Sequence, residues 1–458
     1  MVGIALCVLF RSGLYVFAGR ISFDSDEAIF GLMAKHIAEG TGFAFFRYGQ
    51  QYLMAVSSWM AVPFFWIAGP SIAALKFPAL ILNTVVVGLL VATARRELKL
   101  GAGASLLAAG FLLLPPVRFS GKLTEVACGN IEQYLVVLLA WGLRARPVAL
   151  GVLLGIGILH REFVAYAFGA LVLVDLLEAR PVREIFRSRG KTAAIAAAII
   201  VCGLQVGKLG TGATGITAPL HPAFLWHRVW QTPVWTVKSH LAQMLGYFDV
   251  WQPWGQIAAW GIAGFALLAV HAAIRPWALV RKQTFAWFLL FTSLICVIGY
   301  GIGAPRIETP GYRYNMLFIF FPISLALFFF ALESGKTARL LGTLLLSFWL
   351  GVNAFSHAAF YQRFWTNPPV DKDQRLIDDL RARGVRYAAA SFWDAYRISF
   401  RANENPRVVN TPPPVTILSY LDASVEERQT AVEIRRAPCA SADRVEDWCL
   451  IPWKPSVR

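Results

Sequence analysis

Residues 23–37 read FDSDEAIFGLMAKHI and carry the most specific local pattern in the chain. Their apolar side chains recur at helical spacing, so we expect an amphipathic helix that lies along a membrane surface. Three acids stand at its start, and Asp24 with Glu27 three residues later matches a capping box. A carboxylate at this place can cap the helix, or it can act as a general base or a metal ligand. Both interpretations can hold together, with Asp24 as the cap and Asp26 as the reacting group.

The sequence around this helix is too apolar for a soluble protein. Of the 458 residues, 57% are hydrophobic and 15% are charged, and the mean hydropathy is +0.54. Soluble domains carry about 25% charged residues. This composition excludes an ordinary cytosolic enzyme, a disordered chain and a disulfide-stapled secreted module. Because a span needs about 20 mostly apolar residues, we predict about eleven spans. They are 2–19, 71–93, 103–117, 131–143, 148–162, 163–178, 192–209, 256–274, 284–303, 314–332 and 338–356.

The positive charges predict how these spans are oriented. The formal net charge is +16. Five basic runs fall in every second loop, at 95–99, 144–146, 180–191, 275–282 and 336–339. Since Lys and Arg gather in cytoplasmic loops, these runs predict the inner side, and they account for the basic balance without nucleic acid. The loops between them, including 20–70 and everything after 357, are then external.

Two segments do not fit the simple pattern of spans. Arg11 lies inside the first span, so either its side chain snorkels outward or the true start of the protein lies upstream. Segment 52–69 is apolar but contains Ser57, Ser58 and Pro63. We interpret it as an interfacial helix, because a span here would invert every later loop and break the charge rule.

We therefore predict an all-α polytopic membrane protein over residues 1–356, followed by a small extracytoplasmic α/β domain over 357–458. The first outer loop, 20–70, holds interfacial helices. The expected elements of the second domain are a helix over 371–383 that ends at Gly384, a strand over 385–390, a helix over 392–400, and strands near 407–409 and 415–420. Cys439 and Cys449 both fall there, and whether they form a disulfide stays open because spacing alone does not fix the geometry.

Several stretches of the first outer loop resemble the corresponding loop of GT-C glycosyltransferases. The matching residues are Ser25-Asp26-Glu27-Ala28, Gly31-Leu32-Met33-Ala34, Gly40 with Gly42-Phe43, Tyr48-Gly49-Gln50-Gln51-Tyr52, and positions from Phe64 to Leu75. Gly311–Tyr314 and Phe392–Phe400 extend the likeness. This family of multi-span enzymes uses polyprenyl-phosphate sugars and includes protein O-mannosyltransferases and lipid A aminoarabinose transferases. The nearer likeness is to bacterial family 39-type members.

The resemblance implies transfer of a monosaccharide from a polyprenyl-phosphate donor to a lipid, glycan or protein acceptor. The reaction would take place at the outer face of a bacterial plasma membrane, with inversion. Asp26 maps to the acid that activates the acceptor hydroxyl, and Glu27 stands beside it. The lipid phosphate that leaves needs cationic hydrogen-bond donors, and Arg313, next to Tyr314 at the mouth of a span, is the best candidate.

Other residues are expected to contact the substrates. They are Arg306, Glu132, Gln51, Tyr52, His160 and Arg161. Relatives often have an acid near Glu132, although it can also serve as a helix N-terminal acid. Three ionisable residues stand together at 160–162, where two spans meet, and such groups are expensive at membrane depth unless they are paired or line a cavity.

The chain also departs from the family. The stretch 53–58 lacks the acid that many relatives have after the Tyr-Gly-Gln motif, and no Lys stands near Gln50. These departures keep open a non-catalytic glycan-assembly protein on the same scaffold. A transporter or flippase of lipid-linked glycans also stays open, because it would need ionisable residues at membrane depth and Arg11 and the cluster at 160–162 supply them. The seven His residues have no metal-ligand spacing. No cofactor is expected with certainty, and a divalent ion held by Asp26 and a second acid stays open.

Overall fold

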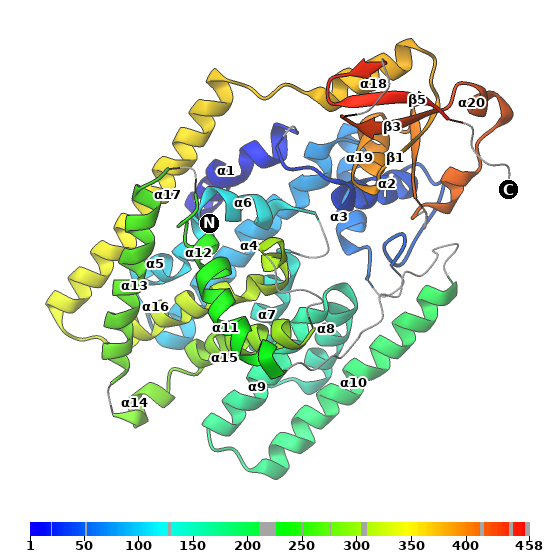
Figure 1. The fold of residues 1–458 in the computed structure, drawn as a ribbon. Coiled ribbons are helices and arrows are strands. Elements are labelled where there is room, and N and C mark those ends of the chain that lie inside the picture. The colour runs from blue at the N-terminus through cyan, green and yellow to red at the C-terminus, as the bar shows by residue number, and fades with distance from the viewer. Residues whose placement is uncertain are drawn as a thin grey trace.

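The computed structural model describes the whole chain except residues 20, 51–52, 127–129, 210–225, 250, 275, 304–308, 413–415, 439–442 and 454–458. A helix lies at each of the eleven predicted spans (Figure 1). These helices are α1 (Val2–Phe17), α4 (Ile72–Leu98), α5 (Ala102–Leu113), α7 (Glu132–Gly142), α8 (Pro147–His160), α9 (Ala165–Leu177), α10 (Val182–Leu209), α13 (Trp254–Ala273), α15 (Thr284–Gly303), α16 (Phe320–Leu332) and α17 (Lys336–Thr366).

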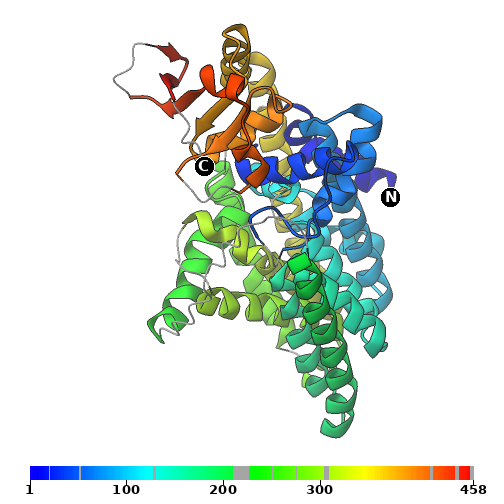
Figure 2. The same ribbon diagram turned by 90° about the vertical axis from the view of Figure 1, so that its right-hand side faces the viewer.

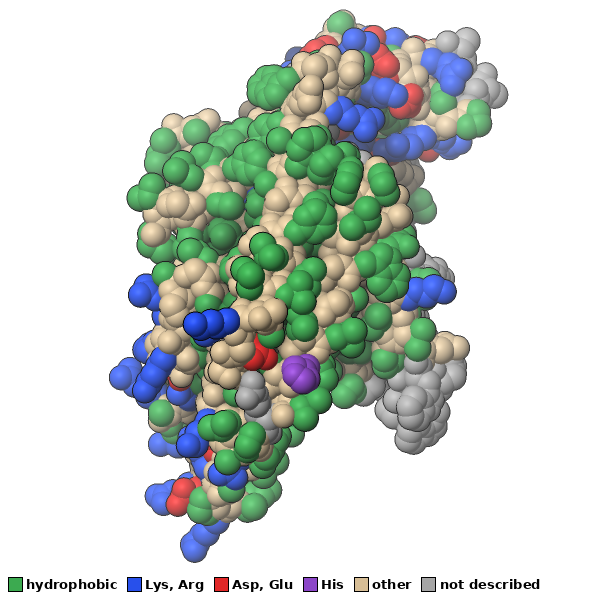
Figure 3. All heavy atoms as spheres, turned by 90° about the vertical axis from the view of Figure 1, so that its left-hand side faces the viewer, with side chains coloured by type: hydrophobic (Ala, Val, Ile, Leu, Met, Phe, Trp, Pro, Cys, Tyr) green, Lys and Arg blue, Asp and Glu red, His purple; other side chains and the backbone are tan. Residues whose placement is uncertain are grey.

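The helices form a multi-pass membrane protein. Among the described residues, six helices are long and apolar enough to cross a membrane alone. A seventh span results if α5 is joined to α6 (Val117–Thr124), which is bent from it by 79°. The number eleven therefore stays a prediction. Figure 3 shows a broad belt of hydrophobic and uncharged side chains between two regions where charged side chains gather. This distribution is the one expected of a protein that sits in a lipid bilayer.

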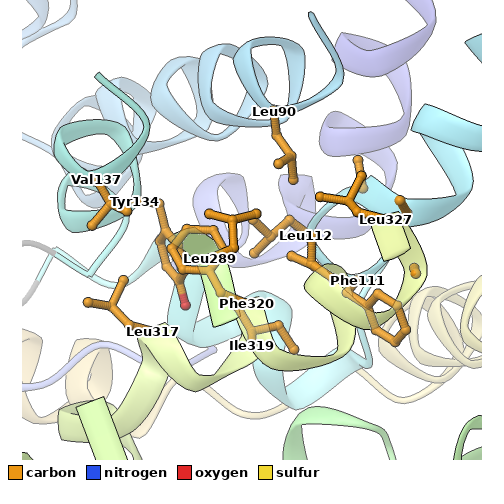
Figure 4. Close-up of a cluster of buried hydrophobic side chains, with 14 of the residues drawn as sticks. Leu90, Phe111, Leu112, Tyr134, Val137, Leu289, Leu317, Ile319, Phe320 and Leu327 are labelled. Atoms are coloured by element: carbon orange, nitrogen blue, oxygen red, sulfur yellow. The ribbon is translucent and has the colours of Figure 1, made fainter. Parts of the chain in front are cut away.

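The main core lies where the helices cross. Figure 4 shows Leu90, Phe111, Tyr134, Leu289 and Phe320 pointing into one cluster from different helices. Tyr134 also donates a hydrogen bond of 2.7 Å to the carbonyl of Met316. This bond satisfies a hydroxyl that would otherwise be costly to bury. Most of the long apolar runs thus contribute to this main core, while Val8 and Val16 of α1 pack with Leu80 of α4 in a smaller cluster.

Arg11 is buried inside the bundle and does not snorkel. Its guanidinium donates to the carbonyl of Leu113 at 3.1 Å and to the side-chain oxygen of Asn83 at 2.5 Å. Leu113 is the last residue of α5, just before the chain bends into α6. Carbonyls at a helix end lack helical partners, so the bend supplies an acceptor that the sequence pattern does not reveal.

The first outer loop folds into α2 (Ser25–Ala38) and α3 (Val56–Ala68), which pack together and against α4. The predicted helix of α2 is confirmed, and its place along the membrane surface stays a prediction. Nearly all of its residues from Ser25 to Lys35 are buried, so it is covered on more than its apolar face. Helix α19 (Phe392–Arg401) covers it, and the Phe400 ring lies 2.6 Å from where a Cβ on Gly31 would stand. Because α19 lies so far along the chain, the local sequence pattern of α2 does not indicate that another helix covers it.

The C-terminal region contains a five-stranded sheet in the order β2-β1-β3-β5-β4. Strand β1 (Tyr387–Ala390) is parallel to β2 (Arg407–Asn410) and β3 (Val432–Arg436), while β5 (Trp448–Pro452) is antiparallel to β3 and to β4 (Arg444–Val445). Figure 2 shows this region at one end of the bundle, beside α2 and α3, while α10 extends toward the other end.

The predicted elements of this region are mostly confirmed. Helix α18 (Lys372–Ala382), β1, α19 and β2 lie where we expected them. The strand predicted near 415–420 is wrong, because its described part leads into the 3₁₀ turn η4 (Leu418–Leu421), and α20 (Val425–Gln429) follows. Helix α17 continues to Thr366, past the predicted boundary at 356. Cys449 is disulfide-bonded, and Cys439, the partner that the sequence left open, lies outside the described residues.

Candidate active site

Asp26 lies in the first turn of α2 with its two carboxylate oxygens facing two different arginines. Oδ1 is 2.7 Å from Nη2 of Arg47, and Oδ2 is 3.3 Å from Nη1 of Arg313. The Asp26 side chain is 14% exposed, so these charge-assisted contacts are partly shielded from water. The first outer loop and the late span are thereby joined at one carboxylate, so Asp26 and Arg313, which were predicted for one site, lie together.

Arg47 is a site residue that the sequence analysis missed. It is buried, and its guanidinium lies 5.7 Å from the centre of the Phe30 ring. A loop holds it, closed by a bridge between Phe46 and Met54 and by a 2.7 Å hydrogen bond from the Arg47 N–H to the Leu53 carbonyl. Arginines in outer loops are usually solvated, so the residue type alone did not suggest a site residue. The one feature of the sequence that could have indicated Arg47 is its place directly before the Tyr48-Gly49 motif.

Arg161 and Arg313 both approach the ring of Tyr314. Their guanidinium carbons lie 5.8 Å and 5.0 Å from the ring centre, and Arg313 donates to the Tyr314 hydroxyl at 3.0 Å. Arg161 is 5% exposed and also lies over Phe163. Among the described residues no carboxylate pairs with Arg161, and its Nε is buried without an acceptor. Among the described residues, Arg161 therefore adds a positive charge here that no carboxylate neutralises.

A break in the helix fixes the direction of Arg313. The residue lies in η3 (Thr309–Ile319), and Asn315 within it has non-helical φ and ψ of −120° and 18°. The Asn315 amide donates to the Thr236 hydroxyl at 3.1 Å and accepts from the Cys296 thiol at 3.2 Å. Thr236 begins η2 (Thr236–Leu241), a π-helical turn, and such turns often mark functional sites.

Glu132 and His160 meet in a second polar group. Glu132 opens α7, and its Oε1 accepts a 2.8 Å hydrogen bond from the hydroxyl of Ser57 in α3. His160 ends α8, with Nε2 3.8 Å from the same Glu132 oxygen and Nδ1 3.1 Å from the Met54 carbonyl. Through Met54 this pair is connected to the loop that carries Arg47. The structure thus brings together residues that the sequence analysis named separately.

Glu27 has different surroundings from its neighbour Asp26. Its side chain is fully buried, with Oε2 3.0 Å from Nζ of Lys76 and Oε1 accepting from the Val126 N–H at 2.8 Å. Burial raises the pKa of the Glu27 carboxyl to about 7. Asp24 accepts from the Glu27 N–H at 3.1 Å, which confirms it as the helix cap. The contacts of Glu27 hold α2 to α4 and to the loop at Val126.

Three predicted site residues, Gln51, Tyr52 and Arg306, lie outside the described residues. In the described part of the chain, no group of three or more His, Cys, Asp or Glu side chains could hold a metal ion. The predicted role of a divalent ion therefore stays a prediction. What the described residues do assemble is one carboxylate among the arginines 47, 161 and 313, an arrangement suited to a phosphate group beside a proton acceptor.

The comparisons with known proteins bear on the fold. No family model and no curated protein matches the chain. The structure of ArnT from Cupriavidus metallidurans bound to undecaprenyl phosphate is similar over 95% of this chain and 92% of that one, with a TM-score of 0.62 and 12% identity. The apo structure of the same protein aligns over the same shares with a TM-score of 0.43 and 13% identity. The chain therefore shares the fold of ArnT, which agrees with the fold that the resemblance implied.

Proposed function

We propose that this protein transfers a monosaccharide from a polyprenyl-phosphate donor to an acceptor hydroxyl at the outer face of a bacterial plasma membrane. The observation that carries the proposal is the Asp26 carboxylate set between Arg47 and Arg313, with Arg161 on the same Tyr314 ring as Arg313 and without a carboxylate partner among the described residues. The fold supports it, because the similar ArnT structure contains undecaprenyl phosphate.

The charges of the site suit the charge changes of this reaction. A sugar linked through a phosphodiester carries one negative charge, and the polyprenyl phosphate that leaves carries about one more. The three arginines would stabilise the charge that develops on the leaving phosphate oxygen, since charge-assisted donors act most strongly where water is excluded. A phosphate that binds Arg313 would also compete with Asp26 for the guanidinium of that arginine.

The chemical step then balances without another reactant. The acceptor oxygen attacks the anomeric carbon, the bond from that carbon to the phosphate oxygen breaks, and its electron pair leaves with the phosphate. Asp26 accepts the proton of the acceptor hydroxyl as general base. A single displacement of this kind inverts the anomeric centre. Glu132, Ser57 and His160 are placed to contact sugar or acceptor hydroxyls, and they are proposed as binding residues.

The test uses purified full-length protein in nanodiscs with a panel of polyprenyl-phosphate hexoses and pentoses and a total lipid and glycan extract. Mass spectrometry follows the release of polyprenyl phosphate by wild type, by Asp26→Asn and by the control Asp378→Asn, which removes an exposed acid on α18. We expect Asp26→Asn to slow release by about 10²–10⁴-fold, the usual contribution of a general base, and the control to match wild type. Equal release by both variants would exclude Asp26 as the base.

A further inference from the structure

The loop that carries Arg47 is connected to the C-terminal region at two neighbouring positions, at Tyr48 through His36 of α2 and at Gly49 by direct packing. The Tyr48 hydroxyl lies 3.0 Å from Nδ1 of His36 on α2, and Nε2 of that ring lies 3.2 Å from Oε1 of Glu404. Glu404 follows α19 and also accepts from the Tyr420 hydroxyl at 2.8 Å and from Nζ of Lys35 at 2.5 Å. One carboxylate of the C-terminal region therefore connects α2, the Tyr48 loop and η4.

The backbone at Glu404 is held in a conformation that costs free energy. Asn403 and Glu404 have φ values of +52° and +61°, in the left-handed region that residues with a side chain rarely adopt. Such strain persists where the surrounding contacts determine it. Although burial alone would raise it, hydrogen bonds from His36 and Lys35 hold the pKa of Glu404 at about 2. The ionised carboxylate is thus fixed in place by its partners.

The second contact lies at the next residue of the loop. Gly49 has a φ of +78°, and a Cβ on it would stand 2.9 Å from Cγ2 of Thr416. The N–H of Thr416 donates to the hydroxyl of the buried Tyr396 at 2.8 Å, so this side of the contact is itself fixed. Both the left-handed conformation and the lack of space require glycine at position 49.

The C-terminal region also contacts α2, the helix that carries Asp26. The Arg397 N–H donates to the hydroxyl of Ser25, the residue before Asp26, at 3.2 Å. The Phe400 ring packs directly on Gly31 of the same helix. The C-terminal region therefore fixes α2 on one side of the pair and the Tyr48–Gly49 turn on the other.

We propose that the C-terminal region is a positioning part of the active site, in which Glu404, through His36 and Tyr48, holds Arg47 at the distance that binds the donor phosphate. This inference rests on the proposed function. Glu404, His36 and Tyr48 act through Arg47 and do not touch the substrate themselves. Their loss should therefore weaken donor binding, because a misplaced guanidinium loses hydrogen bonds to the phosphate, while Asp26 still accepts the proton.

The experiment compares Tyr48→Phe and Glu404→Gln with Arg47→Ala in the full chain in nanodiscs. The control is Glu426→Gln, a change at an acid of the same region whose side chain is 81% exposed. We expect Tyr48→Phe and Glu404→Gln to raise KM for the donor about 5- to 10-fold with kcat changed less than about 3-fold, the pattern of lost binding. In the Arg47→Ala background, Tyr48→Phe should add no further effect, because a residue that acts through Arg47 has nothing left to position.

Two further readouts separate this inference from the proposed function. Hydrogen exchange of residues 45–54 tests the contact without turnover, and we expect faster exchange in both variants than in wild type and Glu426→Gln. Unchanged exchange in this loop would overturn the inference even if the transferase is active. So would effects of Tyr48→Phe that add fully to those of Arg47→Ala. A wild type that binds polyprenyl phosphate but transfers no sugar would overturn the proposed function, and faster exchange with weaker binding in the variants would still support the contact.

Discussion

Asp26 and Glu27 are neighbours in sequence with opposite environments. Successive residues on a helix point about 100° apart, so one carboxylate of α2 meets Arg47 and Arg313 while the next enters a buried pair with Lys76. The motif could predict that an acid of this turn is functional, and the structure separates the two candidates. It could not identify Arg47 as a partner, because nothing local distinguishes a buried arginine in an outer loop.

The buried pair predicts an effect of pH on stability that Glu27→Gln would remove. The pKa of Glu27 in the folded protein is raised to about 7, above the value of about 4.3 expected for an unfolded chain. The folded state then binds the proton more tightly, so its stability falls as the pH rises from about 4 to about 7. The melting temperature of wild type minus that of Glu27→Gln should therefore be higher at about pH 5 than at about pH 8. The opposite sign would show that attraction to Lys76 outweighs burial.

Arg161 predicts a trade between stability and binding. No carboxylate among the described residues pairs with the buried Arg161, and a buried cation without a counter-ion is costly. Arg161→Met should therefore leave the melting temperature unchanged or raise it while weakening the binding of polyprenyl phosphate about 10-fold or more. The matched control is Arg189→Met. Arg189 is also buried, but it donates to both carboxylate oxygens of Asp175, at 2.6 Å and 3.1 Å. Breaking that pair should destabilise by about 3–5 kcal/mol. Equal destabilisation by both variants would mean that Arg161 is structurally paired.

At the level of elements, the long apolar helices of the bundle could be predicted from the sequence. The short strands near the C-terminus and the burial of α2 could not. The helices within the bundle could be predicted from hydropathy. A helix in a bilayer presents apolar side chains along its whole length, whether it faces other helices or lipid. The short strands β3, β4 and β5 have no clean alternation, since β4 spans Arg444–Val445 only and β3 exposes Arg435 and Arg436. The burial of α2 depends on α19, which lies more than 350 residues away in the chain.

The docking of α19 on α2 predicts that Gly31→Ala is destructive. Its Cβ would stand 2.6 Å from the Phe400 ring, so the two helices must separate. The matched control is Gly351→Ala in α17, where nothing lies within 4 Å of the added atom. Alanine favours a helix interior over glycine by about 0.5–1 kcal/mol, so the control should melt at the same or a slightly higher temperature. Thermal unfolding of both variants would show this, and similar curves would argue against close packing at Gly31.

At the scale of the whole molecule, the basic loops gather at one end. Arg144 pairs with Glu97 at 2.9 Å, and Arg189 donates to the Arg144 carbonyl at 2.9 Å and pairs with Asp175. Three of the basic runs used to orient the spans are thus joined by direct contacts. Figure 3 shows Lys and Arg gathered at the end of the molecule away from the C-terminal region. The charge rule and the packing therefore agree on which loops share a side.

This arrangement predicts that the C-terminal region faces outward and the loop before α10 faces the cytoplasm. Single cysteines at the exposed positions Glu426→Cys and Arg183→Cys would report each side, in a parent in which Cys7, Cys128, Cys202 and Cys296 are replaced by serine. With a membrane-impermeant maleimide on intact cells, we expect labelling at 426 only. Labelling at 183 should appear after lysis, and the parent gives the background. Labelling at 183 alone on intact cells would reverse the topology and place Asp26 where an outer-face acceptor could not reach it.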